Sequence, residues 1–193
     1  MTTPVSESLA LQSLAARLEG QQARLPSSTR LPNRLADAAS VSQSVTELGL
    51  LIAEMGQAIH TRIALEPAPE HMLRTAWTYG EVVDRIGQAA SALGAVTDQL
   101  ATITHIAPLR GRPDADQALA TANQVIEEAV ATAHSEFAEA RRSIRTAVSI
   151  IDAQQARVEA ARARSTGDLP RAAPYTQAAA VATPVSPSLV RSH

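Results

Sequence analysis

The chain has 193 residues, a formal net charge of −2 and no cysteine. A balanced charge gives no overall attraction to nucleic acid or to an anionic membrane, and the lack of cysteine excludes disulfides, thiolate-bound metals and cysteine nucleophiles. Because 45% of the residues are hydrophobic and only 2% are aromatic, the composition favours helices packed through small residues over a β-sandwich or barrel.

The origin and location are predicted from the basic residues and the N-terminus. All 17 residues counted as Lys or Arg are arginine. Arginine and alanine codons are rich in G and C, so we expect a bacterial protein from a high-GC genome. The N-terminus has no basic segment followed by a long apolar one, so no Sec signal is predicted and we expect a cytoplasmic protein. The most apolar run, residues 48–59, is interrupted by Glu54 and too short to span a bilayer, so no membrane insertion is expected.

Helical periodicity begins near the N-terminus. Residues 1–25 contain a predicted amphipathic helix from about Val5 to Arg24, with its leucines on one stripe. Pro4 suits the start of this helix, and Pro26 follows its end. Residues 26–33 are rich in turn-forming residues and are predicted to be a linker.

Three longer helices are predicted over residues of about 34–65, 70–107 and 114–164. Their apolar residues recur at steps of three and four, the heptad pattern of coiled coils. Prolines separate the helices, and long helices joined by short connections fold back on one another. The sequence therefore predicts an all-α fold. We expect residues 34–165 to form an elongated antiparallel helical bundle with coiled-coil-like heptad packing, joined by the shorter N-terminal helix.

The predicted fourth helix is longer than the third. A turn near Gly111 would place Ile151 beside His71, so that about a dozen residues of the fourth helix extend past the bundle. Residues 166–193 are rich in proline and alanine without a sustained period, and they are predicted to be a disordered tail.

Five glycines lie inside the second and third predicted helices, each directly after a heptad apolar residue: Gly49, Gly56, Gly80, Gly87 and Gly94. A glycine in a helix interior costs about 1 kcal/mol relative to alanine, so a compensating contact is expected. A hairpin turn centred on Ala68 would place Gly80 opposite Gly56 and Gly87 opposite Gly49. We therefore predict that these glycines allow structural close packing, with two backbones nearer than the usual distance of about 8–10 Å.

The run TYGEVVDRIG at residues 78–87 supports a second interpretation. Thr78 and Glu81 have the spacing of a capping box, and Gly87 would occupy the turn of a helix-turn-helix over residues 78–96. The run resembles the TYGEVA…IG segment that opens the DNA-binding motif of alkylguanine-DNA alkyltransferases, which implies contact with duplex DNA. The Pro-Cys-His-Arg motif of that family has no counterpart here. No basic residue lies between Arg85 and Arg110, whereas DNA reading requires cations, so a continuous helix is favoured.

Charge divides the fourth predicted helix. Acidic residues lie between Pro113 and Glu139, and arginines gather from Ala140 onwards. This order matches the helix dipole and stabilises the helix without any further function. The functional interpretation is a partner surface for an acidic protein or a nucleic acid, formed by Arg141, Arg142, Arg145, Arg157, Arg162 and Arg164.

No catalytic, cofactor-binding or metal-binding motif is found, and we expect no enzyme activity, cofactor or metal. The sequence predicts a non-enzymatic helical interaction or scaffold protein that acts through protein–protein contacts or self-association. One alternative is a nucleic-acid-binding accessory or regulatory protein that uses the arginine-rich end or the helix-turn-helix at 78–96. Another is a type VII-like secreted helical hairpin, exported without a Sec signal. Trp77-x-x-Gly80 resembles the Trp-x-Gly motif of those proteins but has one extra residue.

Overall fold

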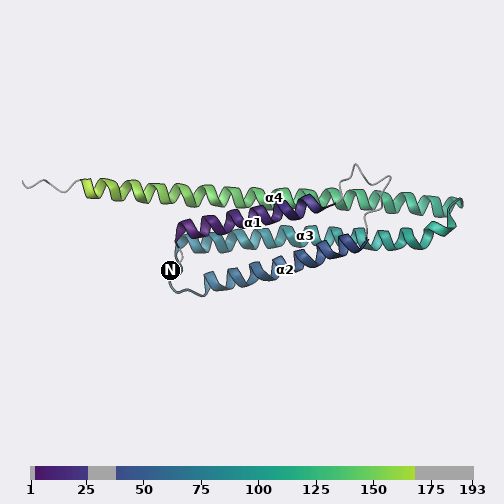
Figure 1. The fold of residues 1–193 in the computed structure, drawn as a ribbon, viewed down its shortest axis with the longest axis horizontal. Coiled ribbons are helices and arrows are strands. Elements are labelled where there is room, and N and C mark those ends of the chain that lie inside the picture. The colour runs from purple at the N-terminus through teal and green to yellow at the C-terminus, as the bar shows by residue number, and fades with distance from the viewer. Residues whose placement is uncertain (1–2, 26–37, 168–193) are drawn as a thin grey trace, which may run out of the picture.

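The computed structural model describes residues 3–25 and 38–167, which form four α-helices. These are α1 (Pro4–Arg24), α2 (Ala38–Ile63), α3 (Glu70–Ile106) and α4 (Pro113–Gly167), with a 3₁₀ helix, η2 (Ala107–Leu109), after α3. Figure 1 shows the helices side by side in an elongated rod. The predicted all-α helical bundle is confirmed. The predicted linker, the first residues of the second helix and nearly all of the predicted tail lie outside the described residues.

The helix ends follow local sequence signals. Pro4 occupies the first turn of α1, and Thr3 caps it: the Thr3 hydroxyl accepts a hydrogen bond from the Ser6 amide at 3.3 Å. The Ser6 hydroxyl accepts one from the Thr3 amide at 2.9 Å, which completes a capping box. Between α3 and α4, Gly111 has a φ of 90°, a conformation that glycine adopts at little cost. Its amide donates to the Asp116 carboxylate at 3.2 Å and fixes the turn.

Successive helices run in opposite directions. Three ion pairs join α1 to α2, and their residue numbers rise along α1 while they fall along α2: Glu7–Arg62, Arg17–Glu54 and Arg24–Glu47. In the same way, α3 and α4 are joined by Arg85–Glu136 and by a hydrogen bond from Gln154 to Glu70. Helix α1 packs against α4 and α3, and α2 packs against α3. The N-terminal helix is therefore the fourth member of an up-down-up-down bundle.

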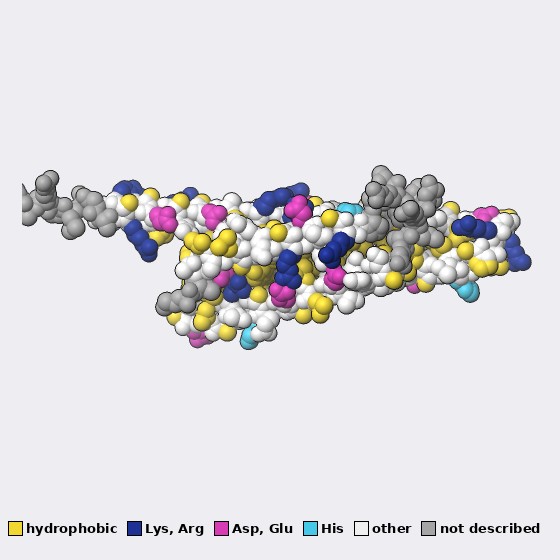
Figure 2. Space-filling view, in the orientation of Figure 1, with side chains coloured by type: hydrophobic (Ala, Val, Ile, Leu, Met, Phe, Trp, Pro, Cys, Tyr) yellow, Lys and Arg dark blue, Asp and Glu magenta, His cyan; other side chains and the backbone are white. Residues whose placement is uncertain are grey.

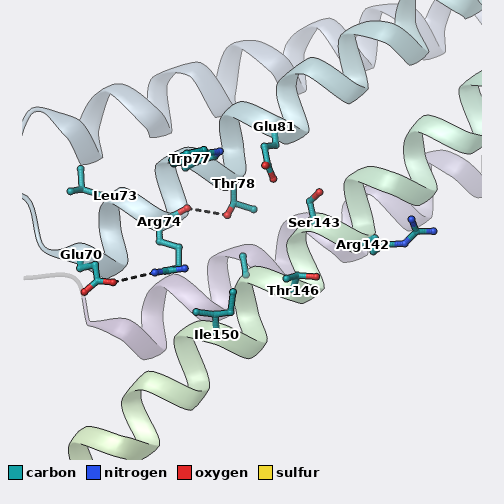
Figure 3. Close-up of a pocket in the computed structure, with 11 residues that line it drawn as sticks. Glu70, Leu73, Arg74, Trp77, Thr78, Glu81, Arg142, Ser143, Thr146 and Ile150 are labelled. Carbon is teal, nitrogen blue, oxygen red and sulfur yellow. Dashed lines mark hydrogen bonds and ion pairs between the residues drawn. The ribbon is translucent and has the colours of Figure 1, made fainter.

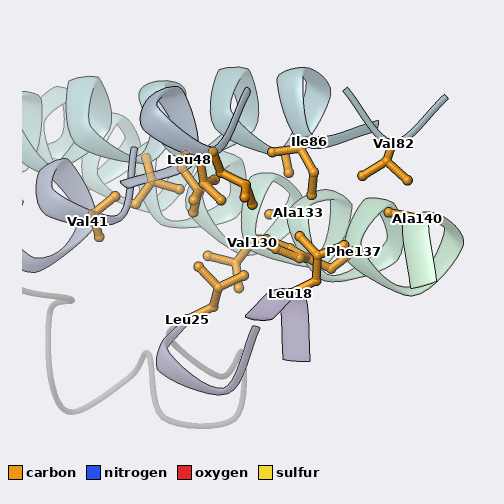
Figure 4. Close-up of a cluster of buried hydrophobic side chains, with 14 of the residues drawn as sticks. Leu18, Leu25, Val41, Leu48, Val82, Ile86, Val130, Ala133, Phe137 and Ala140 are labelled. Atoms are coloured by element: carbon orange, nitrogen blue, oxygen red, sulfur yellow. The ribbon is translucent and has the colours of Figure 1, made fainter. Parts of the chain in front are cut away.

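Heptad residues from all four helices form one core. Phe137 is the only phenylalanine of the chain, and it is fully buried on α4. Ala133 and Ala140 lie about one turn to either side of it and are also fully buried, as is Ala89 of α3. Figure 4 shows Phe137 among Leu18, Val130 and the two alanines. One large side chain thus packs among several small ones at this level of the core.

The prediction of close packing through glycine is wrong. A Cβ atom added to Gly49, Gly56, Gly80, Gly87 or Gly94 would have no neighbouring atom within 4 Å. Each glycine is rotated by about 100° from the core residue before it, which carries it past the α2–α3 contact to the outer margin. Apolar side chains such as Val45, Ile52 and Val83 pack along that contact instead. Alanines of the core, not these glycines, are the small residues that the packing uses.

The continuous helix favoured over residues 78–96 is confirmed, and the alternative of a helix-turn-helix is excluded. Helix α3 is continuous from Glu70 to Ile106 and has no turn at Gly87. Val82, Ile86, Leu93 and other heptad residues on both sides of this glycine are buried in the same core. The energy of burying one uninterrupted stripe therefore exceeds the cost of a glycine in the helix.

The predicted extension of α4 past the bundle is confirmed. Ile151 is the last α4 residue with a buried side chain among those described, and Gln154 bonds to Glu70, the first residue of α3. Val158 would continue the apolar stripe but is 48% exposed. We call residues 152–165 the overhang. Figure 2 shows this end of α4 projecting from the bundle with basic side chains on it.

Replacing the exposed glycines by alanine tests the corrected packing. Gly49, Gly56 and Gly80 have open space around them, so each change to Ala should raise the free energy of unfolding, by up to about 1 kcal/mol. Urea unfolding followed by circular dichroism measures the change. Ala133→Leu is the control, because a large side chain at this fully buried site should destabilise the bundle. Destabilisation by the three glycine changes would contradict the corrected packing.

Candidate partner-binding surface

The structure divides the six arginines of the predicted surface into two groups. Arg141, Arg142 and Arg145 lie beside the bundle, whereas the other three lie on the overhang. Arg141 pairs with Glu19 at 3.1 Å and donates to Gln22 at 3.0 Å, so it attaches α4 to α1. Arg142 pairs with Glu139 at 2.7 Å on its own helix. These two arginines contribute to internal contacts before any partner binds.

Two overhang arginines share one face of α4. Residues seven apart differ by only about 20° around a helix, so Arg157 and Arg164 lie on the same side as Ile150. Arg145 is rotated from Arg157 by about 120°. In the described parts of the chain, no acidic side chain pairs with any of these three arginines. The six arginines therefore do not form one surface.

A groove lies between α3 and α4 on the outside of the bundle. It encloses about 650 Å³, and its large apolar side chains are Leu73 and Trp77 of α3 and Ile150 of α4. Trp77, the only tryptophan of the chain, is 74% exposed, and Leu73 and Ile150 are 47% and 36% exposed. Figure 3 shows these side chains on the two facing helices. We call this hollow the Trp77 groove.

Polar groups border the Trp77 groove at both ends. At one end Arg74 pairs with Glu70 at 3.1 Å, and Gln154 donates a second hydrogen bond to the same carboxylate at 3.2 Å. These hydrogen bonds, that of Arg74 first, lower the pKa of Glu70 below its usual value. Glu81 and Arg142 border the other end. The groove therefore has an apolar centre and ionised ends, as protein-binding sites commonly do.

The overhang is adjacent to the Trp77 groove. A second hollow, of about 780 Å³, lies where α4 leaves the bundle, between the start of α1, the start of α3 and the overhang. Glu70 lines both hollows, and Arg157 lines the second. The groove wall formed by α4 thus continues beyond Glu70, the first residue of α3, along the face that carries Arg157 and Arg164.

A buried charged cluster holds α1 in place. Glu7 is 1% exposed, and its carboxylate accepts a hydrogen bond from the Arg62 Nε at 2.8 Å. Arg62 also donates to the Ala58 carbonyl at 2.9 Å, and its guanidinium carbon lies 4.8 Å from the centre of the Tyr79 ring. Three helices therefore meet at Arg62. Glu7 balances its charge, and its guanidinium group stacks on the Tyr79 ring.

The sequence did not predict the residues of the Trp77 groove or those of the buried Glu7–Arg62–Tyr79 cluster. Leu73, Trp77 and Ile150 are large apolar residues that lie off the heptad stripes of their helices. That departure from the pattern was the available signal. Glu7 lies four residues before Leu11, on the apolar stripe of α1, and an acid at such a position indicates a buried partner. The identity of that partner depends on the tertiary packing.

Among residues 3–25 and 38–167, no three His, Asp or Glu side chains are grouped to hold a metal ion. No helix in the same ranges has the length and apolar character needed to cross a membrane. No known family, curated protein or solved structure matches the chain. The function is therefore inferred from the Trp77 groove and the overhang themselves.

Removing one member of the buried pair should destabilise the bundle. Glu7→Gln leaves the Arg62 charge without its counter-ion in a site where the side chains of Glu7 and Arg62 are only 2% and 14% exposed. We expect the free energy of unfolding to fall by about 3 kcal/mol. Glu54→Gln, which breaks the exposed pair with Arg17, is the matched control and should cost less than about 1 kcal/mol. Equal effects of the two changes in urea unfolding would contradict the role of the buried pair.

The pH dependence of Tyr79 provides a second test. Burial raises the pKa of Tyr79, and the nearby Arg62 charge opposes this change. Because the folded pKa is raised, the contribution to stability is complete below the usual tyrosine pKa of about 10 and is lost as the pH rises through the folded pKa. In a Tyr175→Phe variant, tyrosinate absorbance reports Tyr79 alone. A midpoint at or below that of free tyrosine would contradict the buried position.

Proposed function

We propose that this chain is a non-enzymatic helical interaction or scaffold protein, and that a protein partner binds in the Trp77 groove. The observation that carries the proposal is the 74% exposed Trp77, beside the partly exposed Leu73 and Ile150. Tryptophan is enriched among the residues that dominate binding energy at protein interfaces. An exposed apolar cluster with a polar border is typical of such an interface.

The architecture supports the same proposal. Helices α3 and α4 have 37 and 55 residues, lengths of about 56 and 83 Å. Both walls of the groove are continuous helices whose opposite faces are buried in the core. The groove side chains are thus presented by a rigid support, which lowers the entropic cost of binding. We place this function in the cytoplasm of a bacterium, in agreement with the composition.

The two alternative functions have less support. A nucleic-acid-binding role would rely on the arginines of α4, but Arg141 and Arg142 are paired with Glu19 and Glu139, and the helix-turn-helix is absent from α3. A type VII-like hairpin would carry its tryptophan motif at the turn between helices. Trp77 instead lies inside α3, seven residues after its start at Glu70.

Site-specific photocrosslinking tests the proposed function. A photoreactive phenylalanine analogue at position 77 should give a discrete crosslinked protein in the cells that make this chain, because that position lies in the groove. The same analogue at Leu50 is the control, since Leu50 is 68% exposed and lies on α2. Identical crosslinking patterns at the two positions, or none at 77, would contradict the proposal.

A further inference from the structure

The face of the overhang that continues the Trp77 groove is positively charged. Arg157 and Arg164 lie on this face without an acidic partner among the described residues. Asp152 and Glu159, the acids of the overhang, are rotated from Arg157 by about 140° and 160°. The acids thus lie toward the opposite side of α4 from Arg157, where Glu159 borders the far edge of the second hollow. The face that continues the groove carries the arginines.

The charges at the two ends of the Trp77 groove differ, and the acid that is unpaired among the described residues lies at the end away from the overhang. At the end nearest the overhang, the charge of Glu70 is balanced by Arg74. At the far end Glu81 lines the groove and forms no ion pair within the described residues, whereas Arg142 is paired with Glu139. A partner lying along the groove therefore meets an acid at the far end, apolar side chains in the centre, and arginines on the overhang.

Building on the proposed function, we propose that the occupant of the Trp77 groove is an amphipathic α-helix of another protein, whose acidic end lies against Arg157 and Arg164. Leu73 and Trp77 are four residues apart, and Ile150 lines the same hollow from α4, so a helix with apolar residues at i, i+4 and i+7 can contact all three. Thr146 lines the groove with Trp77, and from Thr146 to Arg164 the distance along α4 is about 27 Å. The partner helix is thus about 20 residues long.

Charge distinguishes this occupant from segments of the chain itself. Residues 169–193 contain no acid, and residues 26–37 contain Asp37 with two arginines. Neither segment provides the acidic end that Arg157 and Arg164 require. The large apolar residues of the heptad stripes are mostly buried in the core, so a second copy would have no long apolar face to place in the groove.

Fluorescence of Trp77 tests the proposal in the full chain, because it is the only tryptophan. The probes are three tryptophan-free helical peptides of about 20 residues with the same leucine stripe. Their last two turns carry glutamate, glutamine or lysine. We expect the glutamate peptide to shift the emission to the blue and to bind about three- to tenfold more tightly than the glutamine peptide. The lysine peptide should bind most weakly.

Substitutions then assign the contacts. Arg157→Gln with Arg164→Gln should abolish the preference for glutamate over glutamine, whereas Arg145→Gln, the same charge change on another face of α4, should preserve it. Trp77→Ala should weaken binding of the labelled glutamate peptide by about 30-fold, measured by anisotropy. Because the three arginines and Trp77 are largely exposed, circular dichroism should show an unchanged fold.

The other outcomes overturn the proposal. Equal binding of the three peptides would show that the partner is not acidic, and no emission shift with any peptide would show that it is not such a helix. The photocrosslinking experiment judges separately whether the groove binds a protein at all. Duplex DNA binding that requires Arg157 and Arg164 but not Trp77 would assign the face to nucleic acid. A dimer in sedimentation that Trp77→Ala dissociates would assign the groove to a second copy.

Discussion

The burial of one apolar stripe along α4 is the constraint on which the rest of the structure depends. Val130, Phe137, Ile144 and Ile151 lie seven residues apart and are all buried, against α1 and α3. A repeat of seven keeps such a stripe on nearly the same side of a helix, so the packed helices remain almost parallel over a long distance. The stripe loses its partners after Ile151, because α1 and α3 both begin at that level. The overhang follows from this difference in helix length.

The interaction surface follows from the same arrangement. Burying the heptad stripes leaves Leu73, Trp77 and Ile150 on the outer margins of α3 and α4, where no further helix of the described chain covers them. Most nearby charges form internal pairs, such as Glu70–Arg74 and Glu139–Arg142. Arg157 and Arg164 lie beyond the N-terminal start of α3, so no acid of that helix reaches them. Burial of the heptad stripes, with α4 longer than α3, therefore produces both the apolar groove and the basic face next to it.

The glycines show where sequence reasoning stopped being sufficient. The periodicity placed Gly49, Gly56, Gly80 and Gly87 on the flanks of α2 and α3 beside their contact, but it could not give the separation of the two helices or show that the glycines lie outside the contact. That separation is set by the larger side chains at the contact, among them Ile52 and Val83. The glycines then face open space. The structure provides no packing reason for glycine at these five positions.

The sequence by itself determined the helices, their order and their antiparallel arrangement, because heptad periodicity, prolines and capping residues are local or regularly repeated signals. It also determined the overhang, which needs only the position of one turn and the lengths of two helices. Tertiary structure alone decided which charges are paired and which apolar residues stay exposed. The Glu7–Arg62–Tyr79 cluster joins residues from three helices, and Trp77 became a groove residue only when α4 lay beside it. Such contacts depend on distances between helices, and residue spacing within one helix does not contain them.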